Sequence, residues 1–139
     1  MNAPVKFDAA DPIGQVDSRV LNGMSVDVEE AFQVGAFEKT IAKDDWGKWE
    51  SRVEANTQRC LDLFAAAGIH ATFFTLGWIA ERHPGLIRRI VAEGHELASH
   101  GWDHQRGFTM TAAEFRADLA RTRAVLEDAG GTKVIGYRA

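Results

Sequence analysis

Cysteine is almost absent from this chain of 139 residues, in which Cys60 is the only one. A single cysteine excludes an internal disulfide and any zinc cluster built from several thiolates. Cys60 falls on the apolar side of a predicted helix, where a buried structural thiol is more common than a nucleophile. Neither disulfide bonds nor a metal centre of several thiolates can therefore stabilise this chain.

The chain also lacks a long hydrophobic run and an excess of basic residues. No stretch reaches the length of a membrane-spanning helix, and residues 1–20 have no apolar core of signal-peptide length. We expect residues 1–20 to form a flexible lead-in and the protein to be cytoplasmic. The 16 basic and 20 acidic residues give a net charge of −4, which argues against a nucleic-acid partner.

Apolar runs alternate with amphipathic stretches along residues 21–139, which we expect to belong to one domain. Buried strands are predicted over residues 21–29, 71–76, 96–99 and 133–137. Helices are predicted between them, two of which begin at the capping-box patterns Ser51–Glu54 and Thr111–Glu114. Such alternation implies parallel strands joined by helical crossovers, so the expected fold class is α/β with about four parallel strands.

Acidic, histidine and arginine side chains follow the ends of the predicted strands. Asp27 and Glu29 end the first strand, and two histidines, His100 and His104, follow the third. Arg138 ends the fourth. The carboxyl ends of parallel strands meet at one edge, where α/β proteins collect their chemistry. The sequence therefore predicts a metal-dependent site, with a loop cap that accepts backbone N–H bonds as the alternative role for Asp27.

The two histidines constrain the backbone between them. Residues four apart in a strand are separated by roughly 13 Å, at about 3.3 Å per residue. Both imidazoles must lie about 2.0–2.1 Å from a shared metal ion. The chain must therefore leave the strand at His100 and turn, which Gly101 makes easier.

Four stretches of the chain together resemble one protein family. They are Ser-Val-Asp-Val-Glu (25–29), Ala-Thr-Phe-Phe-Thr-Leu-Gly-Trp-Ile-Ala-Glu-Arg-His-Pro (71–84), Gly-His-Glu-Leu-Ala-Ser-His-Gly-Trp-Asp-His (94–104) and Gly-Tyr-Arg-Ala (136–139). In this order they resemble the polysaccharide deacetylases, the NodB-homology domain of carbohydrate esterase family four. The Asp-Val-Glu form, followed by Phe32-Gln33-Val34, is most similar to the subgroup associated with exopolysaccharide biosynthesis.

The resemblance implies a distorted (β/α) barrel, of which residues 21–139 would be the N-terminal part. It implies that His100 and His104 are metal ligands, that Asp27 is the catalytic base and that Arg138 pairs with this base. The usual family motif places a second aspartate, a metal ligand, directly after the base, where this chain has Val28. Glu29 is therefore the expected acidic ligand, with Glu30 as the alternative.

The implied reaction removes N-acetyl groups from the amino sugars of a polysaccharide or oligosaccharide, with a metal-activated water as nucleophile. Zinc fits two imidazoles and one carboxylate best, and cobalt, manganese and iron are alternatives. An N-acetylated glycan is the expected partner, and the sequence does not set the oligomeric state. Two other interpretations are a hydrolase of small or cyclic amides and an inactive fragment that binds metal or glycan.

The resemblance further implies that more strands and a histidine general acid follow the arginine in the family. We therefore expect residues 1–139 alone to self-associate through an uncovered sheet edge and to be essentially inactive on N-acetylated sugars.

Two other groups of side chains have more than one interpretation. Trp46, Trp49 and Trp78 are expected near the active face, where each would stack on a sugar ring or pack in the core. Asp118 and Arg121 are interpreted as part of a solvated helix face.

Overall fold

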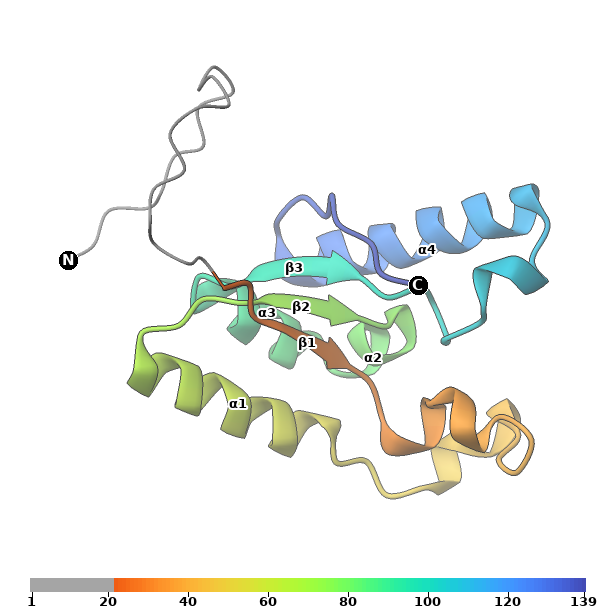
Figure 1. The fold of residues 1–139 in the computed structure, drawn as a ribbon, viewed down its shortest axis with the longest axis horizontal. Helices are drawn as coiled ribbons and strands as arrows, with labels where there is room; N and C mark the ends of the chain where they lie inside the picture. The colour runs from red at the N-terminus through yellow and green to blue at the C-terminus, as the bar shows by residue number, and fades with distance from the viewer. Residues whose placement is uncertain (1–21) are drawn as a thin grey trace, which may run out of the picture.

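The computed structural model describes residues 22–139, so the expected lead-in of residues 1–20 lies outside the described residues. Strands and helices alternate along the chain (Figure 1). The strands are β1 (Ser25–Val28), β2 (Thr72–Thr75) and β3 (Glu96–Ser99), and the α-helices are α1 (Val53–Ala67), α2 (Gly77–Arg82), α3 (Pro84–Ala92) and α4 (Ala112–Gly130). Short 3₁₀ helices are η1 (Ala31–Gln33), η2 (Gly35–Phe37), η3 (Lys43–Lys48) and η4 (Gly107–Thr109). The α/β expectation is confirmed, and the short helix α2 is an addition that the sequence analysis did not predict.

The sheet is parallel, with β2 between β1 and β3. Asp27 on β1 lies opposite Phe74 on β2, which in turn lies opposite Ala98 on β3. Because all the strands run in one direction, their carboxyl ends share one edge of the sheet, on the right in Figure 1. This edge carries the side chains that the sequence analysis singled out.

The predicted fourth strand, residues 133–137, is reduced to one isolated parallel bridge between Ser99 and Tyr137. Ser99 N–H donates to the Gly136 carbonyl at 2.9 Å, and Arg138 N–H donates to the Ser99 carbonyl at 2.9 Å. The start of the segment is held by α4 instead, because Val134 N–H donates to the Glu127 carboxylate at 3.0 Å. The segment therefore meets β3 only at the end that carries Arg138.

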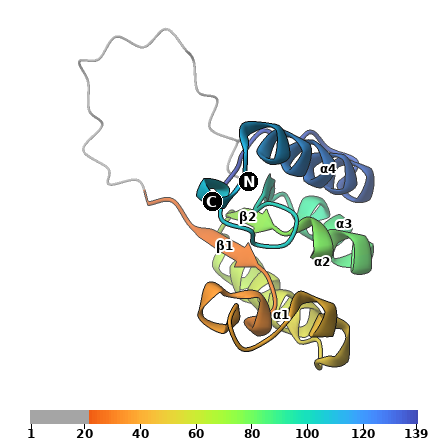
Figure 2. The same ribbon diagram turned by 90° about the vertical axis from the view of Figure 1, so that its right-hand side faces the viewer.

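Helices cover one face of the sheet. Figure 2 shows α1, α2, α3 and α4 in an arc around it. Fully buried side chains from each layer meet there, among them Val28, Leu61, Phe73, Ile87 and Leu126. A parallel sheet with its helices on one face is an arc of a (β/α) barrel, as expected. Within residues 22–139 we find no helix long and apolar enough to cross a membrane.

The two predicted capping boxes have opposite outcomes. The box at α4 is confirmed, since Thr111 Oγ1 accepts from Glu114 N–H at 3.3 Å and the Glu114 carboxylate accepts from Thr111 N–H at 2.7 Å. The box at Ser51–Glu54 is wrong, because α1 begins at Val53 and its N-cap, Arg52, makes no side-chain cap. The Glu30 carboxylate accepts hydrogen bonds from the first backbone N–H groups of α1 instead.

Candidate metal centre and base

The acidic side chains at the end of β1 face away from the helices. Successive side chains of a strand point to opposite faces. Val28 is 1% exposed and packs in the core, so Asp27 and Glu29 on either side of it face the uncovered side of the sheet. Strand alternation thus places both acids where solutes have access.

The two histidines lie on a turn directly after β3. His100 N–H still donates to the Thr75 carbonyl at 3.0 Å, which continues the sheet pairing by one residue. The backbone then turns through left-handed conformations at Gly101 (φ 78°) and at His104 (φ 61°). Left-handed backbone is uncommon outside glycine, although histidine tolerates it better than most residues. The predicted departure from the strand at His100 is therefore confirmed.

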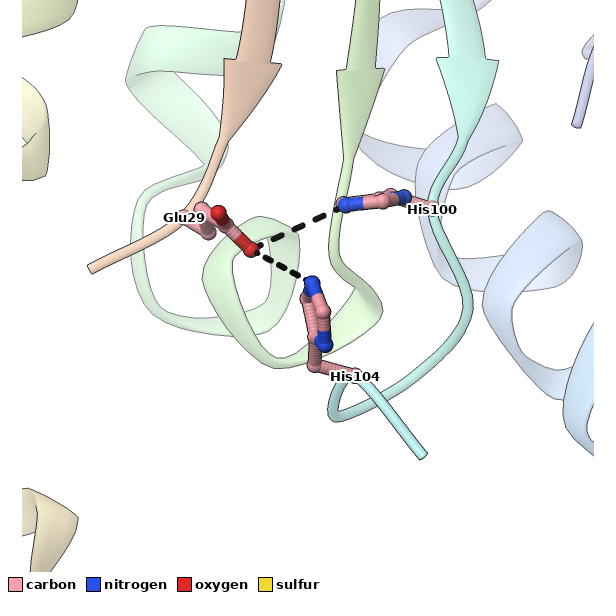
Figure 3. Close-up of side chains that lie close together, drawn as sticks. All are labelled: Glu29, His100 and His104. Atoms are coloured by element: carbon pink, nitrogen blue, oxygen red, sulfur yellow. Dashed lines mark ion pairs between the residues drawn. The ribbon is translucent and has the colours of Figure 1, made fainter. Parts of the chain in front are cut away.

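Glu29, His100 and His104 converge on one point (Figure 3). Glu29 Oε2 lies 3.1 Å from His104 Nε2 and 3.7 Å from His100 Nε2. The two imidazole rings are nearly perpendicular, at 86°, with centroids 4.9 Å apart. The His100 side chain is 4% exposed, that of Glu29 17% and that of His104 27%, so His104 is the most exposed of the three.

The donor atoms of this cluster fit a divalent cation. Ligands at about 2.0–2.1 Å from a tetrahedral ion lie roughly 3.3–3.4 Å from one another. The Glu29–His104 and Glu29–His100 distances of 3.1 and 3.7 Å bracket that spacing. Glu29 Oε2 is also buried without a hydrogen-bond partner among residues 22–139, although two ring nitrogens face it. A buried carboxylate oxygen in this state is suited to a cation that binds both imidazoles.

His100 is oriented by its second ring nitrogen. Nδ1 lies 3.0 Å from the backbone carbonyl of Arg138. A carbonyl only accepts hydrogen bonds, so Nδ1 carries the proton and the lone pair of Nε2 faces Glu29. Histidine ligands of metal ions commonly have such a partner on the other nitrogen. The segment after residue 133 therefore contributes to the cluster through its backbone.

Arg138 joins the last described segment to the first strand. Its Nη1 donates to Asp27 Oδ1 at 2.6 Å and its Nη2 to Ser25 Oγ at 2.8 Å. The guanidinium carbon lies 4.0 Å from the centre of the Phe74 ring, which backs it from β2. The predicted pairing of Arg138 with Asp27 is thus present, and Ser25 is a partner that the sequence analysis missed.

Glu30 lies apart from the cluster, although it is the next residue after Glu29. It is 3% exposed, and its carboxylate accepts from the Ser51 hydroxyl and from the backbone N–H groups of Arg52 (3.1 Å) and Val53 (3.2 Å). A negative charge at a helix N-terminus is stabilised by the helix dipole. Glu30 therefore caps α1, in place of the predicted Ser51 box.

Asp118 is partly buried rather than solvated as the sequence analysis expected, whereas Arg121 is exposed as expected. Both oxygens of Asp118 accept from Trp102 N–H, at 3.2 and 3.3 Å, and the Arg121 guanidinium stacks 3.2 Å from the centre of the Trp102 ring. Burial raises the pKa of Asp118 and outweighs the opposing effect of the Trp102 hydrogen bond. The expectation for Asp118 failed because helical spacing does not show which loop covers a polar face.

The three tryptophans differ in exposure. Trp46 is buried in an aromatic cluster, and Trp78 is partly buried, with Arg82 3.9 Å from the centre of its ring. Trp49 is 52% exposed and lines a cavity of about 720 Å³ together with Phe37, Asp27 and Glu29. Of these three rings, Trp49 is the one placed to contact a solute beside the two acids.

Comparisons with known proteins agree with this geometry. The polysaccharide deacetylase family matches residues 43–139. The peptidoglycan-N-acetylglucosamine deacetylase PgdA of Listeria monocytogenes is 31% identical over 127 residues, which cover 91% of this chain and 26% of that protein. A chitooligosaccharide deacetylase of Sinorhizobium fredii is 48% identical over 48 residues, covering 34% of this chain and 22% of that protein.

A solved structure shows the same arrangement of elements. A putative polysaccharide deacetylase from Mycobacterium smegmatis superposes with a TM-score of 0.69 and 26% identity, over 84% of this chain and 42% of that one. The chain thus spans about a quarter of the length of the Listeria relative and less than half of this structure. The family match, the sequence identity and the superposition lead to one conclusion: the chain belongs to the polysaccharide deacetylase family.

Proposed function

We propose that this chain carries the metal centre and the catalytic base of an enzyme that removes N-acetyl groups from the amino sugars of a glycan. The observation that carries the proposal is the buried Glu29 oxygen, which faces two imidazole nitrogens without a hydrogen bond. The names of the Listeria and Sinorhizobium relatives support N-acetylated glycans as the substrate class. Exopolysaccharide biosynthesis is the setting that the sequence resemblance favours.

Glu29, His100 and His104 would hold the cation, with zinc as the best fit and cobalt, manganese or iron as alternatives. When bound, the ion would lower the pKa of water and stabilise negative charge on the acyl oxygen. The imidazoles would bind it in their neutral form, so acidification should release it.

Asp27 would accept the proton of the attacking water. Hydrolysis would form a bond between the water oxygen and the acetyl carbon and break the bond from that carbon to the sugar nitrogen. The nitrogen would take up a proton from the solvent and leave as the free amine, and the acetyl group would leave as acetate. Arg138 holds the Asp27 carboxylate from one side at 2.6 Å, and Phe74 backs the guanidinium. A general base at a fixed position contributes roughly 10²–10⁴-fold to a rate.

The cavity beside Asp27 and Glu29 supports a ring-shaped substrate over a small amide. It has a volume of about 720 Å³, and two exposed aromatic rings, Phe37 and Trp49, line it. Aromatic rings pack against the apolar faces of sugars and hold them at low entropic cost. Cys60, which is partly buried rather than fully buried as expected, also lines this cavity.

The proposal is tested first by metal binding. The chain should bind about one zinc ion per molecule by elemental analysis, and the double substitution His100→Ala, His104→Ala should abolish binding. Asp27→Asn should leave the zinc content unchanged, because Asp27 lies outside the cluster. Full retention of zinc by the double variant would rule out this centre.

The base is tested with 4-nitrophenyl acetate, whose leaving group departs without protonation and therefore needs no general acid. Zinc-loaded chain should hydrolyse it, and Asp27→Asn should lose roughly 10²-fold or more in kcat. Acetate release from chitooligosaccharide is measured beside it. Stoichiometric zinc with no zinc-dependent hydrolysis of the ester would favour the inactive metal- or glycan-binding alternative.

A further inference from the structure

The turn between His100 and His104 has an uncommon backbone conformation. It contains two left-handed residues, one of which, His104, is not glycine. Such residues persist where the surrounding structure fixes them, and they cluster at functional sites. The contacts that reach the turn from other elements therefore decide whether both imidazoles face Glu29.

One side of the turn is held by the start of α2. Gly77 N–H donates to the Gly101 carbonyl at 3.0 Å, and Trp78 N–H donates to the Trp102 carbonyl at 2.9 Å. Both contacts join backbone to backbone, so no change of side chain removes them directly. They leave the N–H of Trp102 on the other side of the turn without a backbone partner among residues 22–139.

Helix α4 supplies that missing partner. The Asp118 carboxylate accepts from Trp102 N–H through both oxygens, at 3.2 and 3.3 Å, and is partly buried against the turn. One turn further along α4, Arg121 covers the Trp102 ring at 3.2 Å. Asp118 is not one of the three residues that converge on the metal cluster.

We propose that Asp118 is a positioning residue, which fixes the His100–His104 turn by accepting Trp102 N–H and so presents both imidazoles to one cation. The inference rests on the proposed function, because it assigns the turn to metal binding. It concerns the hydrogen-bond acceptor rather than the charge. Other charged groups around Asp118 are Asp103, Lys43 and Arg121, and Lys43 is already paired with Asp103 at 2.6 Å.

Three substitutions in the full chain separate these roles. Asp118→Ala removes the acceptor, Asp118→Asn removes the charge but keeps an acceptor oxygen, and Asp128→Ala removes an exposed acid from the same helix as a matched control. Zinc affinity is measured by competition with a chromophoric chelator, after circular dichroism has compared the folds.

Asp118→Ala should bind zinc about 10–100-fold more weakly, as is typical when a residue that orients metal ligands is lost. Asp118→Asn should restore most of the affinity, and Asp128→Ala should match the unsubstituted chain. The proposal is overturned if folded Asp118→Ala binds zinc normally, or if Asp118→Asn loses as much affinity as the alanine variant. An unfolded Asp118→Ala chain would assign Asp118 to general stability and would also overturn it.

Amide hydrogen exchange tests the same contact without metal. Exchange at Trp102 should be roughly tenfold faster or more in Asp118→Ala than in the unsubstituted chain, and close to normal in Asp118→Asn, because exchange of a buried amide requires opening of its hydrogen bond. Unchanged exchange in the alanine variant would contradict the positioning role. If the unsubstituted chain binds no zinc, the proposed function fails, whereas the exchange rates still show whether Asp118 holds the turn.

Discussion

Glu29 and Glu30 are adjacent acids with different surroundings. Side chains alternate along the end of β1, so Glu29 lies beside the two histidines, whereas the Glu30 side chain lies at the N-terminus of α1. The Glu30 carboxylate satisfies the N-terminus of α1, and its own N–H donates to Gln33 Oε1 at 2.8 Å. Glu30 thus links the N-terminus of α1 to the chain segment that carries Glu29.

Replacement of Glu30 by alanine should therefore destabilise the fold and spare the metal cluster. It would leave Ser51, Arg52 and Val53 without their shared acceptor, and loss of an N-cap acceptor costs about 0.5–2 kcal/mol. The free energy of unfolding, measured in urea, should fall by an amount in the upper part of this range, because Glu30 is buried. The zinc stoichiometry should stay near one. Exposed Asp44→Ala is the control and should change little. Loss of zinc with unchanged stability in Glu30→Ala would reverse the roles assigned to the two glutamates.

For single residues, the sequence predicts the site side chains at the strand ends but not the other side chains that hold them in position. Asp27, Glu29, His100, His104 and Arg138 each follow an apolar run, so their meeting at one edge follows from parallel strands. Their catalytic and metal-binding roles stay predictions. Asp118 gave no such signal, because it stands among other charged residues on a helix, and only the packing of α4 against the turn shows its contact.

Among the elements, α2 supports the site although it contributes none of the predicted catalytic or metal-binding residues. Its first residue, Gly77, lies so close to Trp102 that a Cβ there would be 2.5 Å from the Trp102 ring. This close approach lets α2 donate two backbone hydrogen bonds to the turn. The short helix is thus part of the support for both histidines.

Gly77→Ala should accordingly disturb the turn, and Gly85→Ala in α3 provides a matched control. The Gly77 substitution forces the Trp102 ring or the backbone to move, which for overpacking costs about 1–3 kcal/mol. A Cβ at Gly85 would meet only Arg88, at 3.9 Å, so that change should be neutral or stabilise by about 0.4–1 kcal/mol. Urea unfolding and zinc affinity measure both effects. A Gly77→Ala chain as stable as the control, with normal zinc affinity, would contradict the close packing.

The sequence predicts the end of a helix or strand correctly where hydrogen bonds between residues close in sequence set that end. Thr111 and Glu114 complete each other's hydrogen bonds within four residues, and hydrogen bonding to Thr111 lowers the pKa of Glu114. The same pattern at Ser51 failed because an acid 21 residues earlier in the chain binds that hydroxyl. The fourth strand was overestimated for a similar reason, since Glu127 on α4 binds the N–H of Val134. Such long-range partners are not visible in a local pattern.

Across residues 22–139, the candidate site lies at the carboxyl ends of the strands, and a histidine packed among aromatic rings lies at their amino ends. The cluster and the Asp27–Arg138 pair lie at the carboxyl ends of the strands, and that pair joins residues 111 positions apart. At the amino ends, His95 packs 4.9 Å from Phe73 and 6.0 Å from Phe64, measured between ring centroids. His95 is therefore a core residue whose protonation state affects the stability of the whole fold.

The free energy of unfolding should therefore decrease when the pH falls below the ordinary histidine value of about 6.5. His95 is 7% exposed, and its Nδ1 accepts from Ala71 N–H at 3.2 Å, which requires the neutral ring. Burial lowers the pKa of His95, nearby His70 lowers it further, and Glu93 opposes both. The unfolded chain then binds a proton at a higher pH than the folded chain does, so acidification through this window favours unfolding.

The contribution of His95 is isolated by urea unfolding at about pH 7.5 and about pH 5, on either side of the ordinary histidine pKa. The substitution His95→Asn keeps an acceptor oxygen near the position of Nδ1 but does not titrate. It should lower stability at both pH values through lost packing, yet show a smaller drop between them than the unsubstituted chain. His70→Asn, at an exposed site, should reduce the drop only slightly. Equal pH dependence in the unsubstituted chain and His95→Asn would show that another group controls acid unfolding.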